Sequence, residues 1–443
     1  MIDEGLEGLY MSSKIGIRRE DKNKWERRVP IVPEHVAELK EKFDITTIMQ
    51  PSHIRVFSDE EYRQAGAIVK EDLSDSNIVF AVKEIPIKFF QSGKTYVFFA
   101  HVIKGQKYNM PMLKKMMELG CNLIDYEKIT DENGRRLVFF GRYAGLAGMI
   151  DTLWAFGQRL KLRGISTPLE NVKQTIHYES LSDIKRHLIE IGEKISDHGL
   201  PESISPLVVG FAGYGNVSRG AQEILDMLPV EEISPLDLSS ISSSYSNNVV
   251  YKVIFKEEDM VEKINKDSEG FELKDYYEHP EKYRSVFHQY VPYLSILMNC
   301  IYWEARYPRL VTTDFLKKNF DKDFKLQIVG DISVDIEGAI EFTKKVTTPG
   351  NPVFIYNPET DAITDGYTGE GVVVMAVDNL PCELPRESSR SFSETLIRFI
   401  PDIVKTDFSL EFEDISLPSE IKKAVILYHG KLTSDYEYIN KFL

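Results

Sequence analysis

The sequence predicts an α/β protein of two domains, each with a mostly parallel sheet covered by helices. Three observations carry this prediction. The chain has 443 residues, whereas a single core rarely grows beyond about 250–300 residues. Short apolar runs alternate with longer amphipathic stretches, which is the pattern of sequential strand and helix units. In mid-chain, a glycine-rich turn follows an apolar strand, and we expect a second sheet to begin there.

The composition favours a soluble, cytoplasmic protein that acts on small molecules. Hydrophobic residues make up 42% and charged residues 28%, and no apolar run reaches the roughly 18 residues of a membrane span. The net charge of −15 disfavours nucleic acid and anionic membranes as partners. Residues 1–13 are acidic and lack a secretory signal. Cys121, Cys300 and Cys382 lack ligand spacing, so we expect no metal site.

In the first domain, apolar runs alternate with amphipathic segments. Helices are expected at residues 33–43, where Pro33 suits the first turn, 58–65 and 110–119. We expect strands at residues 14–17, 46–50, 78–82, 95–100 and 122–126. Sequential units of this kind form a parallel sheet with helices on both faces.

The second domain is expected to follow a linking helix at residues 143–162. A charged amphipathic helix is predicted at 182–195, and residues 206–221 are expected to form a strand, a turn and a helix. The serine-rich segment 239–246 is predicted to be a flexible loop. Further strands are expected at 325–329 and 372–377, and the last forty or so residues are predicted to mix helix and loop.

The turn at Gly213-Tyr-Gly215 is typical of a dinucleotide-binding site. The first glycine permits a tight turn, the second lets a pyrophosphate approach the backbone, and the helix N-terminus supplies N–H donors. The predicted cofactor-binding residues are therefore Gly213, Gly215, Asn216, Val217 and Ser218, with Ser218 in place of a third glycine. The alternative is a glycine-rich turn that only packs.

The choice between NADPH and NADH depends on the end of the second strand. An NAD-binding fold usually carries an acid there, about 20 residues after the turn, to hold the ribose hydroxyls. The expected strand, residues 230–233, ends at Ser234, and the next acid is Asp237. The missing acid favours NADPH, but no arginine is present to bind a 2′-phosphate. NADH stays open.

Polar side chains follow four strands of the first domain. Arg18, Lys83, His101 and Glu127 each lie at or just beyond the end of an apolar run, and Glu84 follows Lys83. Carboxyl ends of parallel strands meet at one edge, so we expect these side chains to face one cleft. The alternative for each of them is a solvated residue at a strand end.

Lysine and histidine together suit the joining of an amine to a 2-oxo acid. Such a reaction needs a base for the attacking amine and an acid for the departing water. Burial brings the pKa of lysine toward neutrality, where that of histidine already lies. Glu26 and Arg28 lie between the first strand and helix, and Arg136 lies beside an expected hairpin turn. These arginines are candidates for binding a carboxylate, or are surface charges.

A series of ordered motifs carries a family resemblance. The motifs are Arg-Glu-x4-Trp-Glu-Arg-Arg (19–28), Val-Lys (82–83), Phe-Phe-x-His-x-x-Lys-x-Gln (98–106), Asp-Tyr-Glu (125–127), Gly-Arg-Arg (134–136), Phe-Gly-x-Tyr-Ala-Gly-x-Ala-Gly (140–148), Gly-Asn-Val-Ser-x-Gly-Ala-Gln (215–222), Tyr-Trp-Glu (302–304), Asp-Ile-Ser (331–333) and Asp-Asn-Leu-Pro (378–381). From about Lys14 onward the chain resembles the lysine-ketoglutarate reductase half of the bifunctional aminoadipic semialdehyde synthases. It is more distantly similar to lysine-forming saccharopine dehydrogenase and alanine dehydrogenase.

The resemblance implies two Rossmann-like domains, with the nucleotide domain inserted into the other. We expect the substrate domain at residues 14–150 and 345–443 and the nucleotide domain at 151–344. By resemblance, Lys83 and His101 are the acid/base pair, Arg28 binds the oxo-acid carboxylate, and Asp331 lies near the nicotinamide. The second catalytic half of the bifunctional enzyme is expected to be absent.

The function expected from the resemblance is the reduction that joins L-lysine and 2-oxoglutarate to form saccharopine, or its reverse. NAD-linked saccharopine dehydrogenase and alanine dehydrogenase are the enzymatic alternatives. An inactive nucleotide or amino-acid sensor is the alternative from another class. A homo-oligomer stays open.

Overall fold

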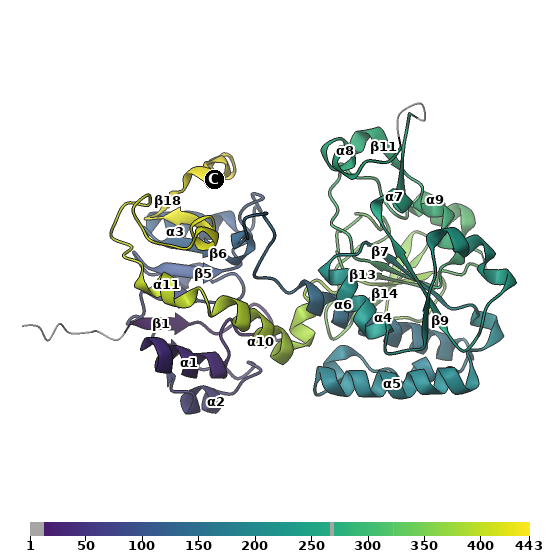
Figure 1. Ribbon diagram of the computed structural model, residues 1–443, viewed down its shortest axis with the longest axis horizontal. Helices are drawn as coiled ribbons and strands as arrows, with labels where there is room; N and C mark the ends of the chain where they lie inside the picture. The colour runs from purple at the N-terminus through teal and green to yellow at the C-terminus, as the bar shows by residue number, and fades with distance from the viewer. Residues whose placement is uncertain (1–12, 266–269, 322) are drawn as a thin grey trace, which may run out of the picture. The chain divides into compact units, whose positions relative to one another are not determined.

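The chain folds into two compact units in the computed structural model (Figure 1), which describes residues 13–265, 270–321 and 323–443. The first unit comprises Met1–Phe140 and Pro385–Leu443, and the second comprises Gly141–Leu384. One unit is therefore inserted into the other. The N-terminal residues 1–12, on which the expectation about a secretory signal rests, lie outside the described part.

The second unit was expected to begin at residue 151 and to end at residue 344. In the structure it begins earlier, at Gly141, and ends later, at Leu384. Helix α4, Gly141–Leu162, is continuous and packs wholly in the second core. Strands β14 (Val353–Asn357), β15 (Ala362–Asp365) and β16 (Val372–Met375) all pair within the second sheet. The chain therefore returns to the first unit only at Pro385.

The first sheet has the order β18-β17-β6-β5-β4-β1-β2-β3. Strands β1 to β6 all pair with one another in parallel. Their bounds are β1 Lys14–Ile17, β2 Thr46–Met49, β3 Ile68–Val69, β4 Ile78–Phe80, β5 Thr95–Phe98 and β6 Asn122–Asp125. The expected parallel sheet is confirmed, and β1 has the expected bounds.

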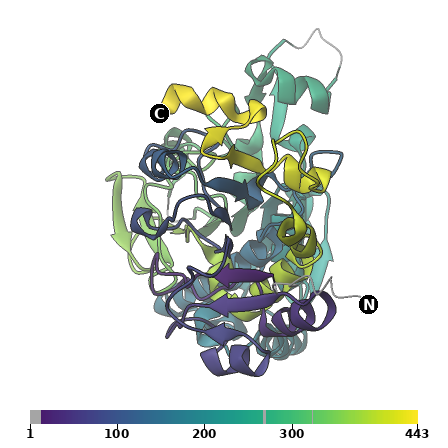
Figure 2. The same cartoon turned by 90° about the vertical axis from the view of Figure 1, so that its left-hand side faces the viewer.

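The C-terminal segment completes this sheet, which corrects the expectation of helix and loop. Strand β17, Val425–Tyr428, is antiparallel to β6, and β18, Lys431–Leu432, is antiparallel to β17. Figure 2 shows these two yellow strands continuing the sheet beyond the blue ones. Four successive buried residues in β17 follow no alternating pattern, and for that reason the run was missed.

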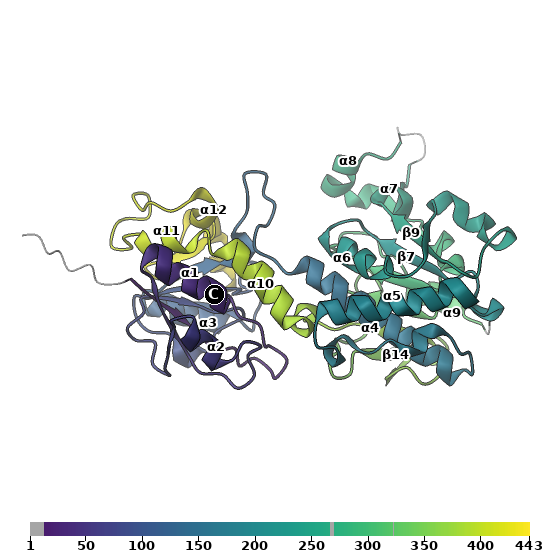
Figure 3. The same cartoon turned by 60° about the horizontal axis from the view of Figure 1, so that its bottom comes forward.

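Helices cover the first sheet. Asp59–Gln64 (α2) begins with a capping box between Ser58 and Glu61, in which each side chain bonds the other residue's backbone N–H. The serines of α10 accept backbone N–H groups near the start of α1, Val29 to Ser389 and Val32 to Ser393, so α10 lies beside α1 (Figure 3). The other bounds are α1 Pro33–Phe43, α3 Met110–Glu118, α10 Pro385–Leu396, α11 Ile400–Lys405 and α12 Ser419–Lys422.

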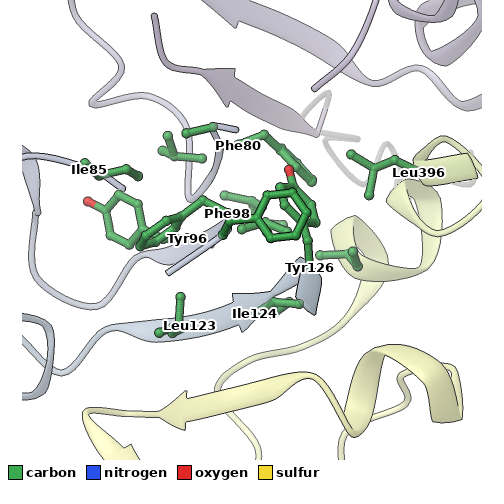
Figure 4. Packing of buried hydrophobic residues seen from close by; sticks show 14 of the residues in the cluster. Phe80, Ile85, Tyr96, Phe98, Leu123, Ile124, Tyr126 and Leu396 are labelled. Carbon is green, nitrogen blue, oxygen red and sulfur yellow. The ribbon is translucent and has the colours of Figure 1, made fainter. Parts of the chain in front are cut away.

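The core of the first unit gathers beneath the strand ends. Phe80 and Phe98 end β4 and β5, Tyr126 follows β6, and all three are fully buried. Figure 4 shows their rings close to Leu396 of α10. Burying a side chain of this size contributes about 1.5–3 kcal/mol to the stability of the fold. Packing in this core therefore fixes the strand ends in place.

The second sheet has the order β15-β14-β16-β13-β12-β7-β9-β8, with β14 and β15 antiparallel to their neighbours and the rest parallel. Alternate residues of β7 face opposite cores: Val209 and Phe211 enter one, Val208 and Ala212 the other. Helices therefore cover both faces, as expected. The remaining strands are β7 Val208–Ala212, β8 Val230–Glu232, β9 Val250–Phe255, β12 Ile296–Asn299 and β13 Ile328–Asp331, and a separate hairpin pairs β10 Val261–Lys263 with β11 Tyr283–Ser285.

Helices α5 (Leu181–His198) and α6 (Asn216–Leu225) pack with α4 on one face (Figure 1). Helix α7 (Glu257–Met260) follows β9, α8 (Leu273–Glu278) lies between the two strands of the hairpin, and α9 (Thr313–Asn319) follows β12. The serine-rich segment is not wholly a loop. Its first part belongs to a 3-10 helix, Pro235–Ser243, because Leu238 and Ile241 are buried and anchor it.

The tightest helix contact joins α4 to α6. A Cβ atom added at Gly145 would overlap the carbonyl oxygen of Val217, and one added at Gly220 would overlap that of Arg142. Both residues must be glycine for the backbones to approach this closely. The helix that follows the glycine-rich turn is thereby fixed against the longest helix of the unit.

We predict that Gly145→Ala lowers the free energy of unfolding by ~1–3 kcal/mol, because an added methyl group overpacks this contact. Chemical denaturation followed by circular dichroism measures the change. Lys161→Ala, at an exposed position of the same helix, is the control and is expected to leave stability unchanged. Equal stability of the two variants would contradict the close backbone approach.

Candidate functional sites

The first unit brings four polar strand ends to one edge of its sheet. Strand pairing continues past the named bounds: the N–H of Arg18 donates to the carbonyl of Phe80 at 2.9 Å, and that of Phe99 to the carbonyl of Val82 at 3.1 Å. The residues that follow, Lys83 and His101, therefore leave neighbouring strands at the same level. This is the edge at which open parallel sheets bind ligands.

His101 is held by a carboxylate. Its Nδ1 lies 2.7 Å from Oε1 of Glu84, and the other oxygen of Glu84 accepts a hydrogen bond from Lys22 at 2.9 Å. The imidazole stacks on Phe99, and its backbone has a left-handed φ of 48°. Although burial raises the pKa of Glu84, the bonds from His101 and Lys22 bring it below its usual range. This hydrogen bond uses Nδ1, so Nε2 is the imidazole nitrogen that it leaves for a further partner.

Lys83 follows strand β4 and is partly buried. Burial, and after it the guanidinium of Arg28, lowers the pKa of Lys83. Its backbone N–H donates to Oε2 of Glu20 at 3.0 Å, and that of Val82 donates to Oε1 at 2.7 Å. Glu20 therefore caps the end of the strand that carries Lys83. The lowered pKa makes the amine of Lys83 suited to act as a base.

Arg28 and Glu26 form a bidentate ion pair inside the first unit. Nε and Nη2 of Arg28 donate to the two oxygens of Glu26 at 2.7 and 2.6 Å, and both residues are buried. The guanidinium also lies 4.2 Å from the centre of the Phe140 ring. Sequence reasoning predicted Arg28 as a clamp for a substrate carboxylate. In the structure, the carboxylate that it clamps is that of Glu26.

The remaining predicted substrate residues are also paired. Nη2 of Arg18 donates to Asp21 at 2.5 Å, and its guanidinium lies over Phe89. Arg136 donates to Glu127, on a hairpin in which Thr130 and Arg136 form an antiparallel bridge. The side chain of Arg136 is half-exposed, so this pair offers one charge of each sign to solvent.

Two buried carboxylates at the strand ends were not predicted. Besides Glu20, Asp125 at the end of β6 accepts the N–H of Glu127 at 2.8 Å and that of Ala100 at 3.3 Å. Burial is the main factor that raises the pKa of each carboxyl to about 7. The hydroxyl of Tyr126 is buried beside them and makes no hydrogen bond within the described residues. The sequence did offer a signal for Asp125, because an acidic residue at the end of an apolar strand is unusual.

The glycine-rich turn of the second unit joins β7 to α6 as predicted. Gly213 has a left-handed φ of 94°, which favours glycine. Gly215 precedes α6 without a side-chain cap, and the space where its Cβ would lie is open. Asn216, Val217 and Ser218 form the first turn, and their N–H groups face the position where a phosphate binds at a helix N-terminus. These features fit a pyrophosphate.

A cleft of about 280 Å³ opens beside this turn. It is lined by residues that follow β7, β9 and β12 and by tyrosines of the α8 region: Gly213, Tyr214, Gly215, Glu257, Met260, Tyr276, Tyr277, Cys300, Ile301, Tyr302 and Tyr307. Three parallel strands thus end at its wall. A dinucleotide-binding sheet binds its ligand at this place.

The strand beside β7 is not the one expected from the sequence. Strand β8 lies at the edge of the sheet, and β9, Val250–Phe255, pairs with β7. The acid to look for is therefore Glu257, just after β9, and not a residue near Ser234. The sequence favoured NADPH because no acid directly follows residues 230–233, and that argument is wrong because this strand does not lie beside β7. The choice of cofactor itself stays a prediction.

Asp331, expected near a nicotinamide, is the last residue of β13 and is buried. Its Oδ1 accepts from Asn299 at 2.8 Å, and its Oδ2 accepts from Thr343 at 2.6 Å. Burial is the main factor that raises the pKa of Asp331 to about 6. These bonds tie the end of β13 to β12 and to the following loop.

Comparison with known proteins agrees with this architecture. The model of the alanine dehydrogenase/PNT N-terminal domain matches residues 16–147, and that of the alanine dehydrogenase/PNT C-terminal domain matches residues 281–435. The chain belongs to the alanine dehydrogenase/PNT family. Two solved structures share the fold: an L-alanine dehydrogenase (TM-score 0.62, 17% identity, 97% of this chain and 98% of that one) and a transhydrogenase from Sinorhizobium meliloti (0.53, 15%, 95% and 100%).

The curated relatives confirm the resemblance that the motifs indicated. Alpha-aminoadipic semialdehyde synthase of Arabidopsis thaliana is 40% identical over 443 residues, which are 96% of this chain and 41% of that protein. The mitochondrial protein of the same name from Mus musculus is 34% identical and covers 98% of this chain and 48% of its own length. A saccharopine dehydrogenase [NAD(+), L-lysine-forming] of Neurospora crassa is 28% identical, covering 84% and 86%. The chain spans less than half of the two synthases.

The described residues lack two further kinds of feature. Among their helices, none is long and apolar enough to cross a membrane. Their histidine, cysteine and acidic side chains form no group of three or more that is placed to hold a metal ion.

We predict that Arg28→Ala lowers the free energy of unfolding by ~3–5 kcal/mol, because it removes the bidentate partner of a buried carboxylate. Urea denaturation measures the loss, with Arg27→Ala, at an exposed neighbouring position, as the control. The double variant Glu26→Gln/Arg28→Met is expected to be more stable than Arg28→Ala alone. A single variant as stable as its control would mean that the pair does not form.

A second prediction concerns pH. Folding raises the pKa of Asp125 to about 7, so between about pH 4 and 7 the folded state binds more protons than the unfolded state. Its contribution to the free energy of unfolding therefore falls as pH rises through this window. Asp125→Asn should show a shallower decrease from pH 5 to 8 than the wild type in denaturant titrations. Exposed Glu132→Gln should match the wild type, and parallel curves for all three proteins would refute the assignment.

Proposed function

We propose that the chain catalyses the reductive condensation of L-lysine with 2-oxoglutarate to saccharopine, or the reverse, with a nicotinamide dinucleotide. The observation that carries this proposal is the arrangement of Lys83, Glu84 and His101 at the ends of the neighbouring strands β4 and β5, where a partly buried lysine follows one strand and a histidine held by a carboxylate follows the other. The relatives' names support the same reaction class.

Lys83 acts as the base in this proposal. The ε-amine of lysine is protonated at neutral pH and must lose a proton before it attacks the 2-oxo carbon. Burial and Arg28 lower the pKa of Lys83, which favours the neutral amine that can take that proton over what an exposed lysine would offer. The attack forms the new carbon–nitrogen bond and a carbinolamine, whose hydroxyl must then leave as water.

His101 supplies the proton for this departure. Glu84 holds Nδ1, so a proton on Nε2 is directed to the carbinolamine oxygen. Loss of water leaves a protonated imine. A reduced nicotinamide, when bound, would supply the hydride that reduces it to the secondary amine of saccharopine. Asp331 and the turn Gly213–Gly215 would hold the cofactor in the second unit.

The charged side chains match the charges of the two substrates. Glu127 and Arg136 form a half-exposed pair of opposite charges, which suits the ammonium and carboxylate of an α-amino acid. Arg18 and Arg28 are the cations proposed for the carboxylates of 2-oxoglutarate, with Glu26 positioning Arg28. Water exclusion at this edge depends on Phe99 and Phe140, which flank His101 and Arg28.

A substrate screen tests the proposal. NADH and NADPH oxidation would be followed with 2-oxoglutarate or pyruvate, each combined with lysine, ornithine or ammonia. Turnover only with lysine and 2-oxoglutarate supports the proposal. Turnover with pyruvate and ammonia would identify an alanine dehydrogenase, and cofactor binding without any turnover would identify a sensor. Cytoplasmic location and homo-oligomerisation stay predictions, for cell fractionation and light scattering.

We predict that Lys83→Met lowers kcat by ~10²–10⁴-fold, the usual contribution of a general base, while the dissociation constant of the cofactor stays unchanged. Methionine keeps the apolar stem, so the fold should survive. Stopped-flow kinetics and fluorescence titration measure the two quantities. Lys88→Met, at an exposed position in the next turn, is the control. A Lys83→Met enzyme within about twofold of wild-type kcat would remove Lys83 from the mechanism.

A further inference from the structure

His101 has a backbone conformation that few residues with a side chain adopt. Its φ of 48° lies in the left-handed region, which costs free energy and persists only where surrounding contacts hold it. Strand pairing does not provide these contacts. The N–H of Phe99 still donates to the carbonyl of Val82, but the next N–H, that of Ala100, donates to the carboxylate of Asp125. The contacts that hold the histidine therefore come from outside the sheet.

Asn109 provides two of these contacts. Its Nδ2 donates to the carbonyl oxygen of Ala100 at 3.0 Å and to that of His101 at 3.2 Å, and the residue is buried. The two carbonyls belong to the peptide groups on either side of the His101 Cα. One amide group therefore restrains φ and ψ of His101 together.

The position of Asn109 in the chain makes this use of its side chain informative. Asn109 directly precedes α3, where an asparagine commonly caps the helix by accepting a backbone N–H. Within the part of the chain that the structure describes, its side chain does not cap α3. Its own N–H donates to the carbonyl of Gln106 at 2.9 Å and closes the preceding turn. The amide of Asn109 is thus committed to the strand end and not to its own helix.

The restrained backbone determines where the imidazole lies. The ring of His101 stacks on Phe99, with ring centres 6.1 Å apart and planes 12° from parallel, and its Nδ1 lies 2.7 Å from Glu84. An ionised carboxylate only accepts hydrogen bonds, so Nδ1 carries the proton in this pair. Rotation about the N–Cα bond changes the direction of Cβ relative to the strand. With φ in the usual negative range, the ring would leave both Phe99 and Glu84.

The C-terminal 3-10 helix, Ser434–Phe442, lies on the loop that follows the histidine. The hydroxyl of Tyr438 donates to the carbonyl of Ile103 at 2.8 Å. The ring of Phe442 covers Gly105, because a Cβ atom added there would lie 2.4 Å from it. The left-handed φ of 69° at Gly105 also favours glycine. The loop is therefore held at its middle by the helix and at its end by Asn109.

Burial separates two kinds of residue in this 3-10 helix. Tyr436 and Ile439 are buried in the core of the first unit and attach the helix to it. Tyr438 and Phe442 are 45% and 40% exposed, so they add little to that core. The core alone therefore does not account for their contacts with the loop.

We infer that Asn109 is a positioning residue for His101 and that the C-terminal 3-10 helix keeps the loop between them closed. Asn109 holds the left-handed backbone, and this backbone directs the imidazole to Phe99 and Glu84. The inference rests on the proposed function in that His101 is the residue that gives a proton to the carbinolamine oxygen.

The ¹⁵N NMR signals of the His101 imidazole test the inference without turnover. They show which ring nitrogen carries the proton, and His101→Gln identifies them by their absence. At about pH 9, above the range in which histidine usually titrates, the wild type should carry the proton on Nδ1. Asn109→Ala should give a mixture with the Nε2–H form, because Nδ1 then loses its acceptor.

Asn122→Ala is the matched control. Asn122 is also a buried asparagine of the first unit, and its Nδ2 donates to Thr95 at 3.0 Å, so its loss should lower stability and leave the His101 signals unchanged. In activity assays, Asn109→Ala should lower kcat by up to about 10²-fold, the cost of a misplacement of about 1 Å. The KM for 2-oxoglutarate should stay within about twofold, since substrate binding is not affected.

The double variant Tyr438→Phe/Phe442→Ala tests the helix. Both side chains are half-exposed, so the fold should survive even if Asn109→Ala does not, and the His101 signals should shift in the same direction to a smaller extent. Unchanged signals in a folded Asn109→Ala protein would overturn the inference, and unchanged signals in the double variant would overturn the role of the helix. A wild type with the proton on Nδ1 that forms no saccharopine would leave the positioning of His101 standing and refute the proposed reaction.

Discussion

Two buried carboxylates hold the strand ends on which the candidate catalytic residues lie. Glu20 accepts the N–H groups of Val82 and Lys83, and Asp125 accepts those of Ala100 and Glu127. Parallel pairing stops at these positions, so their N–H groups would otherwise lack partners in the sheet. Glu20 follows β1, the neighbour of β4, and Asp125 ends β6, the neighbour of β5. The strand ends that carry Lys83 and His101 are therefore fixed from both sides without depending on a flexible loop.

This arrangement buries charge near the place where a substrate must bind. The Arg28–Glu26 pair, Glu20 and Asp125 all lie under the same edge, and burial raises the pKa of both Glu20 and Asp125 to about 7. Burying ionisable groups costs free energy, and well-packed apolar residues would be as stable or more so. Ionisable groups with shifted pKa values nevertheless gather at functional sites, because the chemistry there needs them. The buried ionisable groups of the first unit therefore lower its stability and, in return, fix the charges around Lys83.

The sequence was most informative where a pattern is local. Strand β1 and helix α1 were predicted with their observed bounds, since an apolar run and an N-terminal proline mark them. Strand β17 was missed because its four buried residues follow no alternating pattern, and its partner β6, which lies far away in the chain, is not visible from the local sequence. The same limit applied to cofactor choice. Only the sheet order shows that β9, and not β8, lies beside β7, and so Glu257 was not considered.

Of the candidate site, the residue types and their strand-end positions could be predicted, but their partners could not. Lys83, Glu84 and His101 were predicted as separate side chains, whereas the bond between Glu84 and His101 depends on the register of β4 and β5. Arg28 was predicted to bind a ligand and is found bonded to Glu26, two residues away. Short-range ion pairs of this kind are not distinguishable from ligand-binding residues by spacing alone.

The most direct test of the account follows the ε-nitrogen of lysine. The chain would be incubated with 2-oxoglutarate, reduced cofactor, unlabelled ammonia and lysine labelled with ¹⁵N at the ε-position, and the products would be identified by mass spectrometry. The account predicts saccharopine that retains the label in its secondary amine. An unlabelled amino acid formed from 2-oxoglutarate and ammonia, with lysine unconsumed, would contradict it.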